Sequence, residues 1–138
     1  MNELETVESY ENFIYTLQNR YREIKISNLV LKRTGSLIGE LMGSLTFENN
    51  IRLIVRERLD FKLQLIKAYS YEVWRDQEKL YLYDSQPHPN DANLASTHPH
   101  HKHIQPDIKH NRIPAPNLSF DSPNLSFIIE EIISLLLQ

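Results

Sequence analysis

The sequence contains no cysteine, which excludes disulfides, cysteine zinc sites, iron–sulfur clusters and a thiol nucleophile. No apolar run reaches the roughly 18 residues that a membrane-spanning helix needs. The first residues, Met1 to Glu5, are acidic and have no apolar core, so we expect no signal peptide. Histidine is also absent before His88. Together these absences predict a cytoplasmic protein whose titratable chemistry lies in the later part of the chain.

The length and charge of the chain limit the number of domains and the kinds of partner. A chain of 138 residues fits one domain of ordinary size. The 41% hydrophobic and 24% charged residues are typical of a soluble globular protein. With 15 basic and 18 acidic residues, the formal charge of −3 argues against bulk electrostatic attraction to nucleic acid, but not against a local basic site. We predict a single domain over residues 1–138.

Both ends of the chain have the apolar spacing of helices. The first predicted helix runs from about Val7 to Ile24, and Asn2 with Glu5 resembles a capping box before it. Its periodic residues are Val7, Tyr10, Phe13, Ile14, Leu17, Tyr21 and Ile24. The last helix follows Ser122 and Pro123, which suit a cap and a first-turn proline. Its apolar stripe is Leu125, Ile128, Ile129, Ile132, Leu135 and Leu136, which either packs on the sheet or forms a groove for a second copy, as a homodimer, or for a partner protein.

Between these helices the hydrophobic pattern has a period of two. Strands are expected near residues 28–32, 37–47, 51–56, 65–74 and 80–83, separated by polar turns such as Glu48–Asn50 and Arg75–Glu78. No helical pattern separates them, which predicts an antiparallel meander. Periodicity ends at Asp84 and returns at Ser122, apart from a short strand within residues 103–113. The expected fold is therefore α+β: an N-terminal helix, a four- to five-stranded antiparallel meander, a long His/Pro-rich loop over residues 84–122 and a C-terminal helix packed on the sheet.

All six histidines lie between His88 and His110, in a segment that also contains Pro87, Pro89, Pro99, Pro106 and Pro114. Histidine titrates near neutral pH, so one imidazole can act as general base while another acts as acid. Asp84 could orient an imidazole, and Lys102 could stabilise charge that develops on phosphate oxygens. This set suits metal-free phosphodiester cleavage in which the 2′-hydroxyl of RNA is the internal nucleophile.

Two other interpretations of the histidine segment stay open. Histidine-rich tracts bind zinc, nickel or copper. In an extended chain His98 and His100 share one face and His101 and His103 the other, and His88 or Asp84 would complete a metal site. The second alternative is a surface loop without chemistry. His110, among Lys109, Asn111 and Arg112, is interpreted as a solvated loop residue.

Tyrosines and arginines on the predicted strands are less specific. Tyr69, Tyr71, Tyr81 and Tyr83 recur at period two, which is typical of strand packing; the alternative is that they stack on bases. Arg52, Arg56 and Arg58 share one strand face, which is either solvated or a track for phosphates.

An ordered series of motifs resembles the TumE-like toxins of prokaryotic toxin–antitoxin systems. The series is Tyr69-Ser70-Tyr71, then Tyr83-Asp84-Ser85-Gln86-Pro87-His88, then Thr97-His98-Pro99-His100-His101-Lys102-His103, preceded by a strand pair from Gly39 to Asp60. The resemblance covers about residues 20–137. The chain departs from the family pattern at Glu72, Leu82, Ser85-Gln86 and Pro89.

The resemblance implies a toxin that pairs with a DNA-binding antitoxin and acts on RNA. Our favoured hypothesis is a metal-independent endoribonuclease without a cofactor. Its candidate catalytic residues are Asp84, His88, His100, His101, Lys102 and His103, and its candidate substrate-binding residues are Arg56, Arg58, Tyr69, Tyr71 and Tyr83. The alternatives are a non-enzymatic interaction module and a histidine-rich metal-binding protein.

Overall fold

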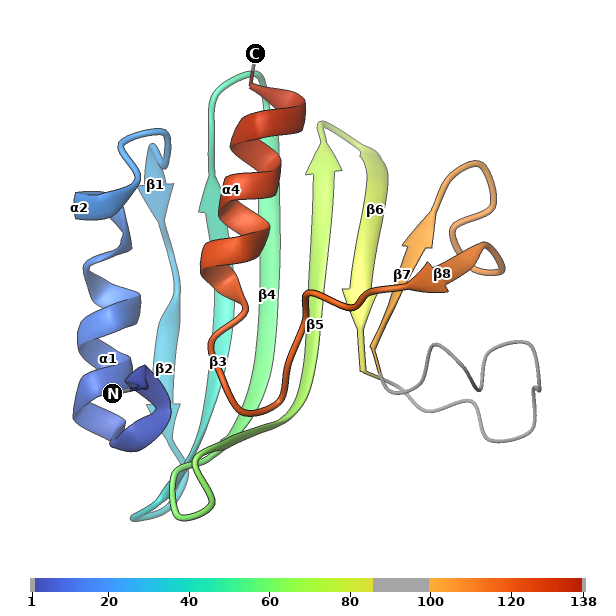
Figure 1. The fold of residues 1–138 in the computed structure, drawn as a ribbon. Coiled ribbons are helices and arrows are strands. Elements are labelled where there is room, and N and C mark those ends of the chain that lie inside the picture. The colour runs from blue at the N-terminus through green and yellow to red at the C-terminus, as the bar shows by residue number, and fades with distance from the viewer. Residues whose placement is uncertain (1, 86–99, 138) are drawn as a thin grey trace.

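Two helices cover one face of an antiparallel sheet in the computed structural model, which describes residues 2–85 and 100–137 (Figure 1). The elements are a 3-10 helix (Glu3–Glu5), α1 (Val7–Tyr15), α2 (Leu17–Arg20), β1 (Ile26–Ser27), β2 (Val30–Arg33), β3 (Ile38–Thr46), β4 (Ile51–Asp60), β5 (Leu65–Arg75), β6 (Glu78–Asp84), β7 (His101–Ile104), β8 (Arg112–Pro114) and α4 (Leu125–Leu136). The fold class is therefore α+β, as predicted. Within the described ranges, no helix is long and apolar enough to cross a membrane.

The sheet is larger than the predicted meander of four or five strands. Over the described residues it has eight strands in the order β1-β3-β4-β5-β6-β7-β8, and β2 also pairs with β3. The additional strands are short, and two of them, β7 and β8, form a hairpin inside the segment predicted as a loop. A strand of two to four residues is too short to show a periodic pattern. In β7 the buried positions are histidines, which a search for apolar alternation does not detect.

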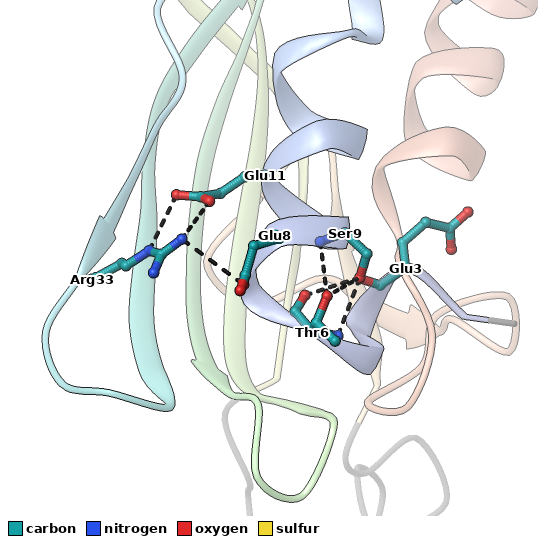
Figure 2. A network of polar contacts seen from close by, with 6 residues as sticks. All are labelled: Glu3, Thr6, Glu8, Ser9, Glu11 and Arg33. Atoms are coloured by element: carbon teal, nitrogen blue, oxygen red, sulfur yellow. Dashed lines mark hydrogen bonds and ion pairs between the residues drawn. The ribbon is translucent and has the colours of Figure 1, made fainter.

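The N-terminal helical region is shorter than the predicted helix from Val7 to Ile24. Helix α1 ends at Tyr15, α2 ends at Arg20, and the chain then leads into β1. Asn2 caps the 3-10 helix, where its side chain accepts from the backbone N–H of Leu4. The capping box of α1 is instead formed by Thr6 and Ser9, whose side chains each accept a hydrogen bond from the other's backbone N–H. Figure 2 shows this cap together with Arg33 of β2, whose guanidinium lies 2.7 Å from the Glu11 carboxylate. The cap closes the start of α1, and the ion pair links α1 to β2.

Strand β4 shows how the sheet builds its core. Alternate residues of this strand point toward the helices and are buried: Ile51, Leu53, Val55, Glu57 and Leu59. The preceding turn is a hairpin, as predicted, and Asn49 and Asn50 adopt φ of 60° and 62° there. The only charged member of the buried row is Glu57.

Glycine is required at one position of β3. Gly43 has a φ of +130°, and a Cβ added there would lie 2.1 Å from the carbonyl oxygen of Asn28. The chain between β1 and β2 therefore passes directly against the backbone of β3 at this point. This close approach accounts for the division of the edge into two short strands.

Helix α4 packs its apolar stripe on the sheet. Leu125, Ile128, Ile129 and Ile132 are fully buried, whereas Leu135 is 63% exposed. The residue that precedes the helix is Asn124 rather than the predicted Ser122–Pro123 pair, and its side chain does not cap the helix. Instead it accepts a hydrogen bond from the backbone N–H of Ser119 at 2.9 Å and donates to the hydroxyl of Tyr71 at 3.1 Å. The start of α4 is thus tied to the core of the sheet.

The sheet face opposite the helices, here called the open face, carries the alternate residues. In β4 these include Arg56 and Arg58, which are exposed. Figure 1 shows both α1 and α4 on the other side of the strands. The open face therefore offers side chains from several strands to ligands.

Candidate functional site

The register of the sheet brings distant parts of the chain into one row on the open face. Arg56 pairs with Ser70, Ser70 with Asp84, and Asp84 with His101. Residues directly opposite each other in an antiparallel sheet project from the same face. Neighbouring strands lie about 4.8 Å apart, so the Cα atoms of Arg56 and Asp84 are separated by about 10 Å. The arginines of β4 and the histidines of β7 therefore belong to one surface.

Asp84, His101 and His103 form a compact group, here called the Asp84 cluster. Nε2 of His101 lies 2.5 Å from Oδ1 of Asp84, and Nε2 of His103 lies 3.4 Å from Oδ2 of the same carboxylate. The two imidazole centroids are 5.0 Å apart. His101 is fully buried and His103 is 6% exposed, whereas the Asp84 side chain is 18% exposed. A single carboxylate thus contacts two imidazoles in a largely enclosed setting.

The second nitrogen of His103 limits its protonation state. Nδ1 lies 2.9 Å from the carbonyl oxygen of Ile108, and a carbonyl can only accept, so Nδ1 carries the proton. In a neutral ring Nε2 would then present its lone pair to the Asp84 carboxylate, which is repulsive. The arrangement is favourable when His103 is an imidazolium or when a cation lies between Nε2 and Asp84.

His100 and Lys102 lie on the helix-covered side of the sheet. Successive residues of a strand point to opposite faces, so neither reaches the Asp84 cluster. The hydroxyl of Tyr69 is 2.6 Å from Nδ1 of His100, and the two rings stack at 9°. Nζ of Lys102 lies 3.5 Å from Glu131 of α4 and 4.3 Å from the centroid of Tyr81. The structure therefore does not bring Lys102 together with His101 and His103.

The candidate substrate tyrosines are also on the helix-covered side. Tyr71 is fully buried, and Tyr69 and Tyr83 are 4% and 3% exposed. The hydroxyl of Tyr83 donates to Glu131, and burial raises the pKa of both Tyr69 and Tyr83 well above the usual value. Their packing agrees with the structural interpretation of the period-two tyrosines, and their rings lie on the side of the sheet opposite the Asp84 cluster.

Glu57 is a titratable residue that the sequence analysis did not select. It is 2% exposed, and its two carboxylate oxygens accept hydrogen bonds of 2.5 Å from Tyr10 and Tyr71. Burial raises the pKa of this carboxyl to about 7, and the two hydrogen bonds oppose that shift. The signal that could have found it is the alternation of Ile51, Leu53 and Val55, which places residue 57 inward.

Arg56 and Arg58 line a depression of about 410 Å³ on the open face. The side chains around it include Glu40, Met42, Ser70 and Ser85. Neither arginine forms an ion pair with another residue in the described part of the chain. Two guanidinium groups thus lie on the same sheet face as the Asp84 cluster, with Glu40 of β3 directly opposite Arg58.

His88, a candidate catalytic residue, and His98, a candidate metal ligand, lie outside the described residues.

Fold and site together define a small α+β protein with an aspartate–histidine cluster and free arginines on an open sheet face. The family model described as "Toxin TumE" matches residues 14–136, so the chain belongs to the TumE toxin family. This confirms the resemblance that the ordered motifs indicated, and it makes the chain a toxin of a toxin–antitoxin system with an antitoxin as partner. Neither the curated proteins nor the solved structures gave a match.

Proposed function

We propose that this toxin is an endoribonuclease that uses histidine acid–base catalysis and needs no metal. The observation that carries the proposal is the Asp84 cluster, where one carboxylate contacts Nε2 of both His101 and His103. Acid–base cleavage of RNA requires one group that accepts a proton and a second group that donates one at the same phosphate. Imidazole centroids 5.0 Å apart are close enough to serve the same scissile phosphate.

In the proposed reaction the 2′-oxygen of RNA attacks the adjacent phosphorus. His101 takes the 2′-hydroxyl proton on Nδ1 as the new P–O bond forms, because its Nε2 faces Asp84, which holds the imidazole in position and stabilises the positive charge it acquires. His103, as an imidazolium, gives a proton to the departing 5′-oxygen as its bond to phosphorus breaks. The products are a 2′,3′-cyclic phosphate end and a 5′-hydroxyl end.

The assignment of His103 as the acid follows from its contacts. Its Nδ1 donates to the Ile108 carbonyl oxygen, so its Nε2 faces Asp84 most favourably when it also carries a proton. Arg56 and Arg58 supply positive charge on the same face, where they would hold phosphates next to the scissile one. These contacts support a substrate strand that lies across the open face.

A cleavage assay with purified protein and RNA in EDTA tests the proposal. We expect cleavage to continue in EDTA, to show a bell-shaped pH profile near neutrality and to release 2′,3′-cyclic phosphate ends. His101→Ala and His103→Ala should each lose about 100-fold or more in rate. His110→Ala is the matched control, since that ring is 68% exposed and pairs with Asp107. Cleavage retained in both cluster variants would refute the mechanism.

A metal-binding function is the second candidate, and one observation favours it. Single ligand atoms of Asp84, His101 and His103 all lie within 4.8 Å of one another, and two imidazoles with one carboxylate suit zinc or another divalent transition metal. Here the cation, rather than a proton, would lie between His103 and Asp84. Stoichiometric metal in purified protein that His103→Ala loses, together with loss of activity in EDTA, would support this function over the first.

A further inference from the structure

A second basic depression lies beside the Asp84 cluster, on the side away from Arg56 and Arg58. It measures about 770 Å³ and is lined by Lys79, Leu82, His103, Asp107, Lys109 and Arg112 among others. His103 pairs directly with Leu82 of β6 and with Arg112 of β8, so these three side chains share the open face. The depression therefore begins at a member of the cluster and extends over the β7–β8 hairpin.

Lys109 and Arg112 are the cations that this depression offers to a ligand. Lys109 is exposed and forms no ion pair with any described residue. Nε of Arg112 is enclosed, yet it has no hydrogen-bond acceptor among residues 2–85 and 100–137. An enclosed guanidinium N–H without an acceptor carries a desolvation cost that a bound anion would remove.

Two other charged side chains around the depression, Lys79 and Asp107, have partners of their own. Nζ of Lys79 lies 3.8 Å from Glu72 and 5.3 Å from the centroid of Trp74. The Asp107 carboxylate lies 2.9 Å from Nδ1 of His110. Lys109 and Arg112 are therefore the lining cations that have no carboxylate partner among the described residues.

From this arrangement we infer that Lys109 and Arg112 bind a backbone phosphate of a single-stranded RNA, on the opposite side of the cleavage point from Arg56 and Arg58. The inference rests on the proposed function and extends it. It defines the path of the substrate across the sheet. The RNA strand passes from the β4 arginines, over the Asp84 cluster, to the β7–β8 hairpin. It also identifies the substrate as a strand with several phosphates rather than a mononucleotide.

Binding of a 2′-O-methyl oligoribonucleotide of about ten nucleotides tests this inference without cleavage, because the substrate has no 2′-hydroxyl nucleophile. Arg112→Gln combined with Lys109→Gln should weaken binding about tenfold and lower the slope of log K against log salt by about 0.7 for each lost phosphate contact. Lys109→Gln alone changes only an exposed side chain and should lose one contact. The control is Arg22→Gln with Lys62→Gln, which removes the same charge from exposed residues elsewhere and should leave the slope near that of the unaltered protein.

The outcomes separate this inference from the proposed function. Binding that depends on Lys109 and Arg112, in a protein that does not cleave unmodified RNA, would overturn the nuclease proposal and leave the phosphate site standing. Cleavage accompanied by unchanged binding in the double variant would overturn the phosphate site alone. The site would also be overturned if the unaltered protein does not bind the oligonucleotide. The same conclusion would follow if inorganic phosphate at an equal phosphate concentration displaces it completely.

Discussion

Replacement of Glu57 by glutamine should remove a pH dependence from the stability of the fold. The Glu57 carboxylate connects three elements, because Tyr10 of α1 and Tyr71 of β5 donate to it and Asn124, next to α4, donates to Tyr71. Burial raises the pKa of the Glu57 carboxyl from 4.5 to about 7. The folded protein thus holds this proton at pH values where the unfolded chain has released it.

The sign and size of the effect follow from proton linkage. A carboxyl whose pKa is raised by folding stabilises the folded state fully below its pKa in the unfolded chain, near 4.5. This stabilisation is lost as the pH rises through the folded-state pKa of about 7. The shift corresponds to roughly 3 kcal/mol in the free energy of unfolding. Domains of this size are stable by only about 5–15 kcal/mol, so the loss would be a large share of the total.

Urea unfolding of the unaltered protein and of Glu57→Gln, from pH 4.5 to pH 8, measures this difference. We expect the unaltered protein to lose roughly 3 kcal/mol relative to the variant across that range. Glu5→Gln, which removes a carboxyl from an exposed position, is the control and should follow the unaltered protein. The reasoning would be refuted if the difference in free energy of unfolding between the two proteins does not change with pH. It would also be refuted if the unaltered protein gains stability relative to the variant as the pH rises.

Three further predictions concern stability. Gly43→Ala should lower the free energy of unfolding by about 3 kcal/mol or more, because its Cβ would lie 2.1 Å from the Asn28 carbonyl oxygen at a φ of +130°; an unchanged melting temperature would contradict this. Lys102→Met should cost about 1 kcal/mol through loss of the contact with Glu131, and a double-mutant cycle with Glu131→Gln should give a coupling of that size rather than additivity. Thr6→Ala should cost about 1 kcal/mol by removing the α1 cap, and equal urea midpoints for the two proteins would contradict it.

The local pattern of the sequence was sufficient to predict much of the fold. The alternation around Ile51, Leu53 and Val55 predicted β4, and the paired asparagines predicted the turn that precedes it. The order of the motifs around Asp84 and His101 was also sufficient to indicate the toxin family, which the family model confirms. These features succeed because they depend on residues close together in the chain, where period and turn chemistry act directly.

Only the tertiary structure decided which of the candidate residues meet. His101 and Lys102 are neighbours in sequence, but successive residues of β7 point to opposite faces of the sheet. His101 therefore contacts Asp84, whereas Lys102 contacts Glu131 of α4. Arg112 lies within the short strand expected over residues 103–113, but only the β7–β8 hairpin shows that it stands opposite His103. Strand register is set by long-range burial and pairing, which no short window of sequence records.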